Sequence, residues 1–138
     1  MKKKIKILLI PFFMFLAICV YFEIYCIRSH ARNVELDYGK PQLYTFEEVK
    51  AAGNVLIEDF KSNDIFRGYK LKRLYYDEED SKETSCDYRK EMIVIRSCYK
   101  VGLFPSDVTD DSPFENKDQY WILGRESSDD PWVIEDYY

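Results

Sequence analysis

The stretch YWILGR at residues 120–125, followed by WVI at residues 132–134, decides how this chain folds. Both runs are rich in β-branched and aromatic residues, and a polar loop that ends in Pro131 separates them. This composition predicts a β-hairpin. The runs contain Trp121 and Trp132, the only two tryptophans of the chain, and these are the largest apolar side chains available to a small core. We therefore expect Trp132 to be a core residue, packed near the strand that carries Trp121.

One helix and two further strands are predicted upstream of this hairpin. Thr45 and Glu48 have the spacing of a capping box, and apolar residues then recur at helical spacing, which predicts a helix over residues 46–61. Residues 69–77 and 91–101 are predicted to be strands, with a bulge near Lys72-Arg73 where the alternation slips. The acidic run after the first of these strands is expected to be a solvent-exposed turn. The predicted fold class is therefore α+β, with one helix packed on a curved antiparallel four-stranded sheet.

The amino-terminal residues predict a transmembrane helix. Four lysines lie within residues 2–6, and residues 7–27 are apolar except for Glu23. About 21 residues at a rise of 1.5 Å span about 30 Å, the thickness of the hydrocarbon core of a bilayer. Because lysines favour the cytoplasmic side, the expected localisation is the cell membrane, with a single pass through residues 7–27 and an extracytoplasmic domain. The expected organisation is a membrane anchor over residues 1–28, a linker over residues 29–42 and an α+β domain over residues 43–138.

Two alternatives to an uncleaved anchor stay open at this point. A cleaved signal peptide would make the protein secreted, and Ser29-His30-Ala31 has the small-x-small pattern of a cleavage site. The apolar run is longer than the roughly 7–15 residues usual for a signal peptide. A lipoprotein is the second alternative, because Leu16-Ala17-Ile18-Cys19 is similar to a lipobox. Ile18 stands there where a small residue is expected.

The charge of the domain excludes one class of partner. Between Leu43 and Tyr138 there are 13 Lys and Arg residues against 22 Asp and Glu residues. An acidic surface repels phosphate backbones, so nucleic acid is not an expected partner. The partners that remain are a peptide, a protein or a small apolar ligand, in addition to the membrane.

The sequence offers no assignable catalytic, cofactor or metal site. His30 is the only histidine and lies outside the domain, so Ser–His–Asp and Cys–His sites are not expected. The acids between residues 107 and 118 lack the spacing of a calcium-binding loop, and no glycine-rich phosphate loop is present. We therefore expect no cofactor, and a non-catalytic binding or protein-interaction module rather than an enzyme. The alternative is a small hydrolase or isomerase that uses carboxylates.

Cysteines and aromatic residues are the remaining candidates for special roles. Cys86 and Cys98 are able to form a disulfide if the domain lies outside the cytoplasm. Otherwise Cys98 is a buried apolar residue and Cys86 a free thiol. Some aromatic side chains are expected either to face a ligand or to fill the core, and the candidates are Tyr69, Tyr76, Tyr99, Trp121 and Trp132.

Several stretches of the domain resemble a known bacterial family. They are YTFEE at residues 44–48, GYKLKRLYYDEE at residues 68–79, and WILGR with WVI in the hairpin. The family comprises short secreted or membrane-anchored proteins of Gram-positive bacteria that are classified as a domain of unknown function. The resemblance covers roughly residues 43–138 and implies a reduced cystatin-like or nuclear-transport-factor-2-like cone. It brings no catalytic residues, and the ending EDYY at residues 135–138 departs from the glycine–tyrosine ending of the relatives.

Overall fold

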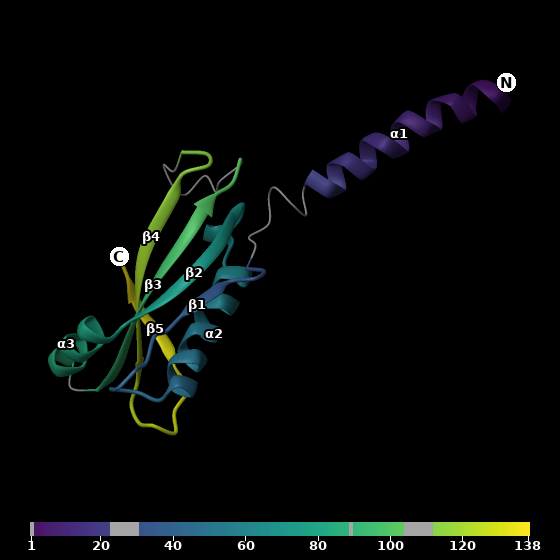
Figure 1. Ribbon diagram of the computed structural model, residues 1–138. Helices are drawn as coiled ribbons and strands as arrows, with labels where there is room; N and C mark the ends of the chain where they lie inside the picture. The colour runs from purple at the N-terminus through teal and green to yellow at the C-terminus, as the bar shows by residue number, and fades with distance from the viewer. Residues whose placement is uncertain (1, 23–30, 89, 104–111) are drawn as a thin grey trace.

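The computed structural model describes residues 2–22, 31–88, 90–103 and 112–138, with side chains from Ile10 onward. Within these residues the chain forms helices, one short 3-10 turn and the strands of one sheet (Figure 1). In chain order the elements are α1 (Lys2–Phe22), β1 (Glu35–Asp37), α2 (Phe46–Ser62), η2 (Asp64–Phe66), β2 (Tyr69–Asp77), α3 (Glu78–Tyr88), β3 (Glu91–Val101), β4 (Asn116–Arg125) and β5 (Val133–Tyr137).

The sheet has five strands in the order β1-β2-β3-β4-β5, and it is mixed. β1 runs parallel to β2, with Leu36 opposite Leu74, whereas the other neighbours are antiparallel. The prediction of a four-stranded antiparallel sheet is therefore wrong. The difference arises in the predicted linker 29–42, which contributes β1 and places Tyr38 in the core. A strand of three residues gives too short a pattern to be recognised by its alternation.

Helix α2 lies against one face of the sheet (Figure 1). The predicted capping box is confirmed, because Glu48 N donates to Thr45 Oγ1 (3.3 Å) and Thr45 N donates to a Glu48 carboxylate oxygen (2.8 Å). The buried residues of the helix recur at helical spacing and form one stripe toward the sheet; they are Val49, Ala52, Gly53, Leu56 and Phe60. The predicted bulge is also confirmed, since the register of β2 against β3 shifts between Leu71 and Arg73.

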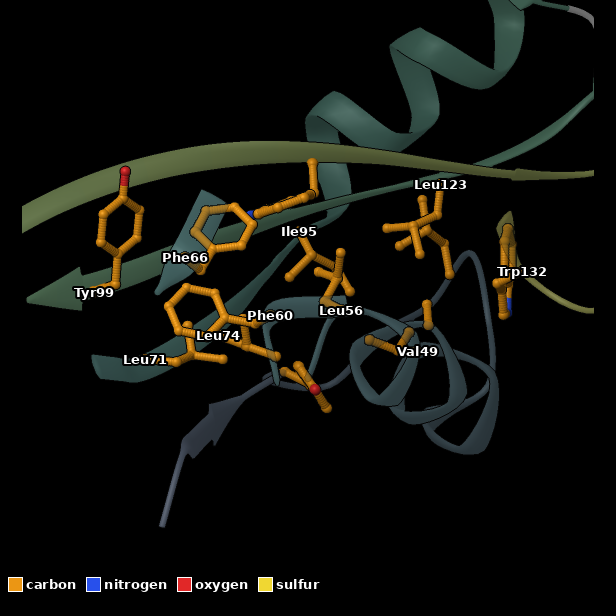
Figure 2. Close-up of a cluster of buried hydrophobic side chains, with 14 of the residues drawn as sticks. Val49, Leu56, Phe60, Phe66, Leu71, Leu74, Ile95, Tyr99, Leu123 and Trp132 are labelled. Atoms are coloured by element: carbon orange, nitrogen blue, oxygen red, sulfur yellow. The ribbon is translucent and has the colours of Figure 1, made fainter. Parts of the chain in front are cut away.

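The main core fills the space between α2 and the sheet (Figure 2). Phe66 lies between Phe60 and Trp121, at ring-centroid distances of 4.6 and 5.5 Å. Trp121 donates its indole N–H to Ser97 Oγ (2.8 Å), so its single polar atom is satisfied. Burying this aromatic cluster supplies the main hydrophobic stabilisation of the fold.

The acidic segment after β2 is a helix, not the predicted exposed turn. Helix α3 begins at Glu78 directly after β2, and the acids Glu78, Glu79 and Asp80 lie in its first turn, where they interact favourably with the helix dipole. Ser81 and Ser85 lie one turn apart and accept hydrogen bonds from the N–H groups of Val94 (2.8 Å) and Met92 (3.1 Å). The helix thus replaces β2 as the neighbour of β3 beyond Asp77. Because α3 has no apolar stripe, its sequence carries no helical periodicity.

The predicted transmembrane helix is not supported. Among the residues that the structure describes, no helix is both long enough and apolar enough to cross a membrane. The part of helix α1 that is described covers Lys2–Phe22. Residues 23–27, which the prediction counted in the span, lie outside the described residues, as does most of the proposed signal-peptide cleavage site.

The Tyr38 side chain, which directly follows β1, packs closely against Gly53 of α2. A Cβ atom added at Gly53 would lie 1.9 Å from the Tyr38 hydroxyl, which is buried and has no hydrogen-bond partner among the described residues. Burial raises the pKa of Tyr38 to about 12. Close approach of Tyr38 therefore explains why a glycine is present inside this helix.

Removing the Tyr38 hydroxyl is expected to stabilise the protein. An unsatisfied buried polar group costs about 1–3 kcal/mol, so Tyr38→Phe should raise the free energy of unfolding by about 1 kcal/mol. Gly53→Ala should lower it by about 1–3 kcal/mol through overpacking, and by less in the Tyr38→Phe background. Urea denaturation of the two single variants and the double variant checks this. Equal costs of Gly53→Ala in both backgrounds would contradict the contact.

Candidate functional site

The aromatic residues singled out from the sequence belong mainly to the core. Tyr69, Tyr99, Trp121 and Trp132 are all buried in the cluster between α2 and the sheet, and Tyr76 is half-buried against it. They contact each other and α2, so they fill the core rather than face a ligand. Trp132 is therefore a core residue, as predicted.

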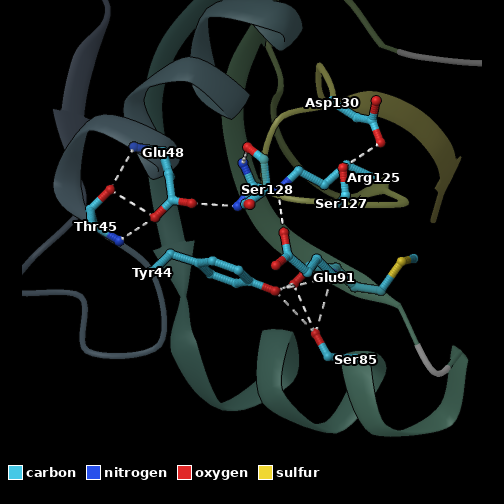
Figure 3. Close-up of polar contacts among 10 residues, drawn as sticks. Tyr44, Thr45, Glu48, Ser85, Glu91, Arg125, Ser127, Ser128 and Asp130 are labelled. Carbon is cyan, nitrogen blue, oxygen red and sulfur yellow. Dashed lines mark hydrogen bonds and ion pairs between the residues drawn. The ribbon is translucent and has the colours of Figure 1, made fainter.

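Arg125 organises the polar contacts at one end of the domain (Figure 3). Its guanidinium is buried and forms ion pairs with Glu48 of α2 and Glu91 of β3, and Nη1 donates to the carbonyl of Ser128 (3.1 Å). The guanidinium also lies over the Trp132 ring, with its carbon 4.3 Å from the ring centroid. The side chain thus joins α2, β3 and the β4–β5 loop.

The same contacts argue against an acid–base role for this carboxylate pair. The hydrogen bond from Arg125, followed by those from Thr45, lowers the pKa of Glu48 to about 2. A general acid needs a pKa near the working pH, which burial or a neighbouring carboxylate would have to raise. Glu48 and Glu91 are instead neutralised by one arginine, so the pair is structural.

A small hollow of about 280 Å³ lies between residues 37–41 and the end of β2. Its lining includes Asp37, Tyr75, Tyr76 and Glu78. The Glu78 carboxylate accepts hydrogen bonds from the backbone N–H groups of Gln42 (3.1 Å) and Leu43 (2.8 Å), so it holds the chain in place. Small-molecule sites usually enclose about 300–1,000 Å³ and bury most of the ligand. This open hollow is smaller than that range and suits no more than one side chain of a larger partner.

The outer face of the sheet, which we define as the face opposite α2, carries a continuous row of polar aromatic residues and arginine. The strand register places Asp37 of β1 opposite Tyr75 of β2, Tyr75 opposite Arg96 of β3, and Arg96 opposite Tyr120 of β4. Tyr138, just after β5, exchanges two backbone hydrogen bonds with Tyr120 (2.8 and 3.0 Å) and extends the row. One row therefore crosses the whole sheet.

The members of this row hold one another in place. The Arg96 guanidinium carbon lies 4.6 Å from the centroid of the Tyr75 ring, and the rings of Tyr120 and Tyr138 stack at 5.3 Å with planes 5° apart. A hydrogen bond with the Tyr120 phenol raises the pKa of Arg96, so the guanidinium is charged at all physiological pH values. Tyr75 and Arg96 are half-buried, whereas Tyr138 is 66% exposed. The row is thus ordered and accessible at the same time.

Cys86 and Cys98, which the sequence left open as a possible disulfide, are both free thiols in the structure. Cys86 lies on the exposed side of α3, an element that the sequence did not predict. Cys98 is half-buried on the outer face of β3, opposite Asp118. Burial, followed by a hydrogen bond to Asp118, raises the pKa of the Cys98 thiol. This thiol is therefore not activated as a nucleophile.

A metal centre finds no support in the described part of the chain. Residues 2–22, 31–88, 90–103 and 112–138 contain no group of three His, Cys, Asp or Glu side chains arranged to hold an ion. Asp107, Asp110 and Asp111, part of the acidic run considered for calcium, lie outside these residues.

Comparison with protein-family models, with curated proteins and with solved structures found no match to this chain. The resemblance suggested by the sequence therefore stays a prediction, and the site has to be judged from its own geometry.

The alternation of residues in the sequence is enough to place two tyrosines of the row on the outer face, but the aromatic residues were considered there only as core or ligand-facing candidates. Tyr75 precedes Tyr76, and Tyr120 precedes Trp121, so each outer-face tyrosine lies next to a residue on the core side. Adjacent residues of a strand point to opposite faces. Once Trp121 is assigned to the core, the alternation places Tyr120 outside.

Proposed function

We propose that this protein is a non-catalytic binding module that recognises a peptide or protein segment with the outer face of its sheet. The observation that carries the proposal is the ordered row of Tyr75, Arg96, Tyr120 and Tyr138, which α2 does not cover. Tyrosine and arginine are over-represented among the residues that dominate binding energy at protein interfaces.

The contacts within the row reduce the entropic cost of binding. Immobilising a flexible side chain on association costs about 0.5–1.5 kcal/mol. Arg96 is already held over Tyr75, and Tyr138 is already stacked on Tyr120. Binding of a partner to these side chains therefore requires little additional ordering of them.

The enzyme alternative has less support. The two carboxylates that converge on one place, Glu48 and Glu91, are both paired with Arg125. Glu78, in the hollow, accepts backbone hydrogen bonds from residues 42 and 43. Among the described residues, these three carboxylates are therefore engaged in structural contacts, and the open hollow that contains Glu78 would not exclude water from a reaction.

Selection from a displayed library of random peptides tests the proposal. The full chain is immobilised, bound peptides are sequenced, and their affinities are measured for the wild type and for Tyr75→Ser/Tyr138→Ser. Loss of two interface tyrosines should weaken binding by about tenfold or more, which corresponds to about 1.4 kcal/mol. Amide resonances of β2, β3 and β4 should shift on titration, and those of α2 should not.

Tyr88→Ser is the matched control, because it removes an exposed tyrosine on α3 that is not part of the row. It should leave the affinity unchanged within about twofold, a difference of about 0.4 kcal/mol. An equal loss for Tyr88→Ser, or a selection that yields no binding peptide, would rule the outer face out as the binding surface.

A further inference from the structure

A positively charged stripe crosses the outer face where the domain as a whole is acidic. The outward positions of β2 and β3 include Lys70, Arg73, Arg96 and Lys100. Lys70 lies directly opposite Lys100, and Arg73 lies opposite Cys98, which is two residues after Arg96 on β3. With the exposed Lys72 at the bulge of β2, five cations lie on these two neighbouring strands, in a domain with 13 basic and 22 acidic residues.

The two lysines at the end of the stripe form no ion pair with the described part of the chain, residues 10–22, 31–88, 90–103 and 112–138. The ion pairs formed by the described residues include Arg73 with Glu35, but none that involves Lys70 or Lys100. The Lys100 ammonium lies 5.7 Å from the centroid of the Phe114 ring. Like charges directly opposite each other on neighbouring strands destabilise the pair. An anionic group bound between Lys70 and Lys100 would remove that repulsion.

Acidic residues border the stripe on both sides. Glu35 and Asp37 lie on β1, and Asp118 lies on β4 opposite Cys98. Neighbouring strands are about 4.8 Å apart, so the positive stripe on β2 and β3 is about as wide as one extended chain. A broader polyanion would meet the acids at the borders, whereas a single extended peptide would not.

The spacing of the cations along β3 sets the pattern that a partner has to match. Arg96 and Lys100 are four residues apart on one strand. At about 3.3 Å per residue, their Cα atoms are about 13 Å apart. Two acidic side chains four residues apart on an extended peptide have the same separation and lie on the same face of that peptide.

We propose that the partner of the outer face is an extended acidic peptide segment that lies along β2 and β3, with acidic side chains four residues apart that pair with Arg96 and with the Lys70–Lys100 pair. This inference rests on the proposed function, since it names the chemistry of the segment that the same face recognises. The phenol rings of Tyr75 and Tyr120 beside Arg96 contact the remaining side chains of the peptide.

Two matched pools of short fluorescent peptides test the inference on the full chain. One pool has Asp at two positions four residues apart and uncharged residues, randomised, elsewhere; the other has Asn at the same two positions. The Asp pool should bind about tenfold tighter at low salt, and the difference should shrink at physiological salt because surface ion pairs are screened. Lys70→Gln/Lys100→Gln should remove most of this difference.

Lys50→Gln/Lys82→Gln is the matched control, since it removes the same charge from exposed lysines of α2 and α3. This control variant should keep at least half of the difference in affinity that the wild type shows between the Asp pool and the Asn pool. Equal binding of the Asp and Asn pools overturns the acidic-peptide inference. The proposed function still holds in that case if both pools bind the Tyr75→Ser/Tyr138→Ser variant more weakly than the wild type. Inorganic polyphosphate serves as the competitor. If it displaces the Asp pool and binds more tightly than that pool, through Lys70 and Lys100, the assignment to a peptide is overturned. No binding of either pool overturns both.

Discussion

Replacing Trp132 with alanine is expected to lower the free energy of unfolding by about 3–5 kcal/mol. The indole is 5% exposed, contacts the Tyr44 ring edge-on at 5.5 Å, and lies under the Arg125 guanidinium. Truncation therefore removes a large buried apolar area, opens a cavity and ends a cation–π contact. Because the free energy of unfolding of single domains is only about 5–15 kcal/mol, the variant should lose a large part of its stability.

Urea denaturation followed by circular dichroism measures this effect. Trp132→Phe should cost clearly less than Trp132→Ala, because it keeps an aromatic ring under Arg125 and the indole N–H has no hydrogen-bond partner to lose within the described residues. Val133→Ala is the control at the adjacent position, since Val133, the first residue of β5, is exposed. It should change the free energy of unfolding by about 0.5 kcal/mol or less. A Trp132→Ala variant as stable as Val133→Ala would contradict the position of Trp132 in the core.

Local signals in the sequence were sufficient for the elements that depend on neighbouring residues. Thr45 and Glu48 predicted the start of α2 because both halves of a capping box lie within one helical turn. The slip between Leu71 and Arg73 predicted the bulge because the alternation of side chains has a period of two. Strand β3 has the bounds that its continuous apolar content predicted, Glu91–Val101.

Elements that are stabilised by distant partners could not be predicted in this way. Strand β1 consists of three exposed residues, and only its pairing with β2 makes it a strand. Helix α3 is polar, and it is held by hydrogen bonds of Ser81 and Ser85 to β3 rather than by an apolar stripe. Tertiary contacts override local propensity in both cases.

The candidate site could be predicted only in part from local signals in the sequence. The alternation along β2 and β4 was enough to place Tyr75 and Tyr120 on the outer face. Their alignment with Arg96 depends on the register between three strands, which the bulge in β2 shifts by one residue. The sequence supplied the residue types of the row, and the three-dimensional pairing supplied the row itself.

Replacing Arg125 with methionine is expected to lower the free energy of unfolding by about 3 kcal/mol at neutral pH. Methionine keeps much of the buried volume but leaves Glu48 and Glu91 without their shared cation. Removing one partner of a buried ion pair costs about 3–5 kcal/mol, and the lower end applies because both carboxylates reach solvent. Arg125→Lys should recover only part of the loss, because one ammonium cannot bind both acids and the Ser128 carbonyl as the guanidinium fork does.

The pH dependence separates this ion pair from simple packing. In the wild type the folded-state pKa of Glu48 is about 2, below its ordinary value of 4.5, chiefly because of the hydrogen bond from Arg125. A group with a lowered folded-state pKa stabilises the protein above the unfolded-state pKa, and this stabilisation is lost as the pH falls from about 4.5 toward 2. The cost of Arg125→Met should therefore be largest at pH values above 4.5 and should shrink toward pH 2. Glu48→Gln, which cannot titrate, should also flatten this acid dependence, and a cost of Arg125→Met that stays the same from neutral to acidic pH would show that Arg125 acts through packing alone.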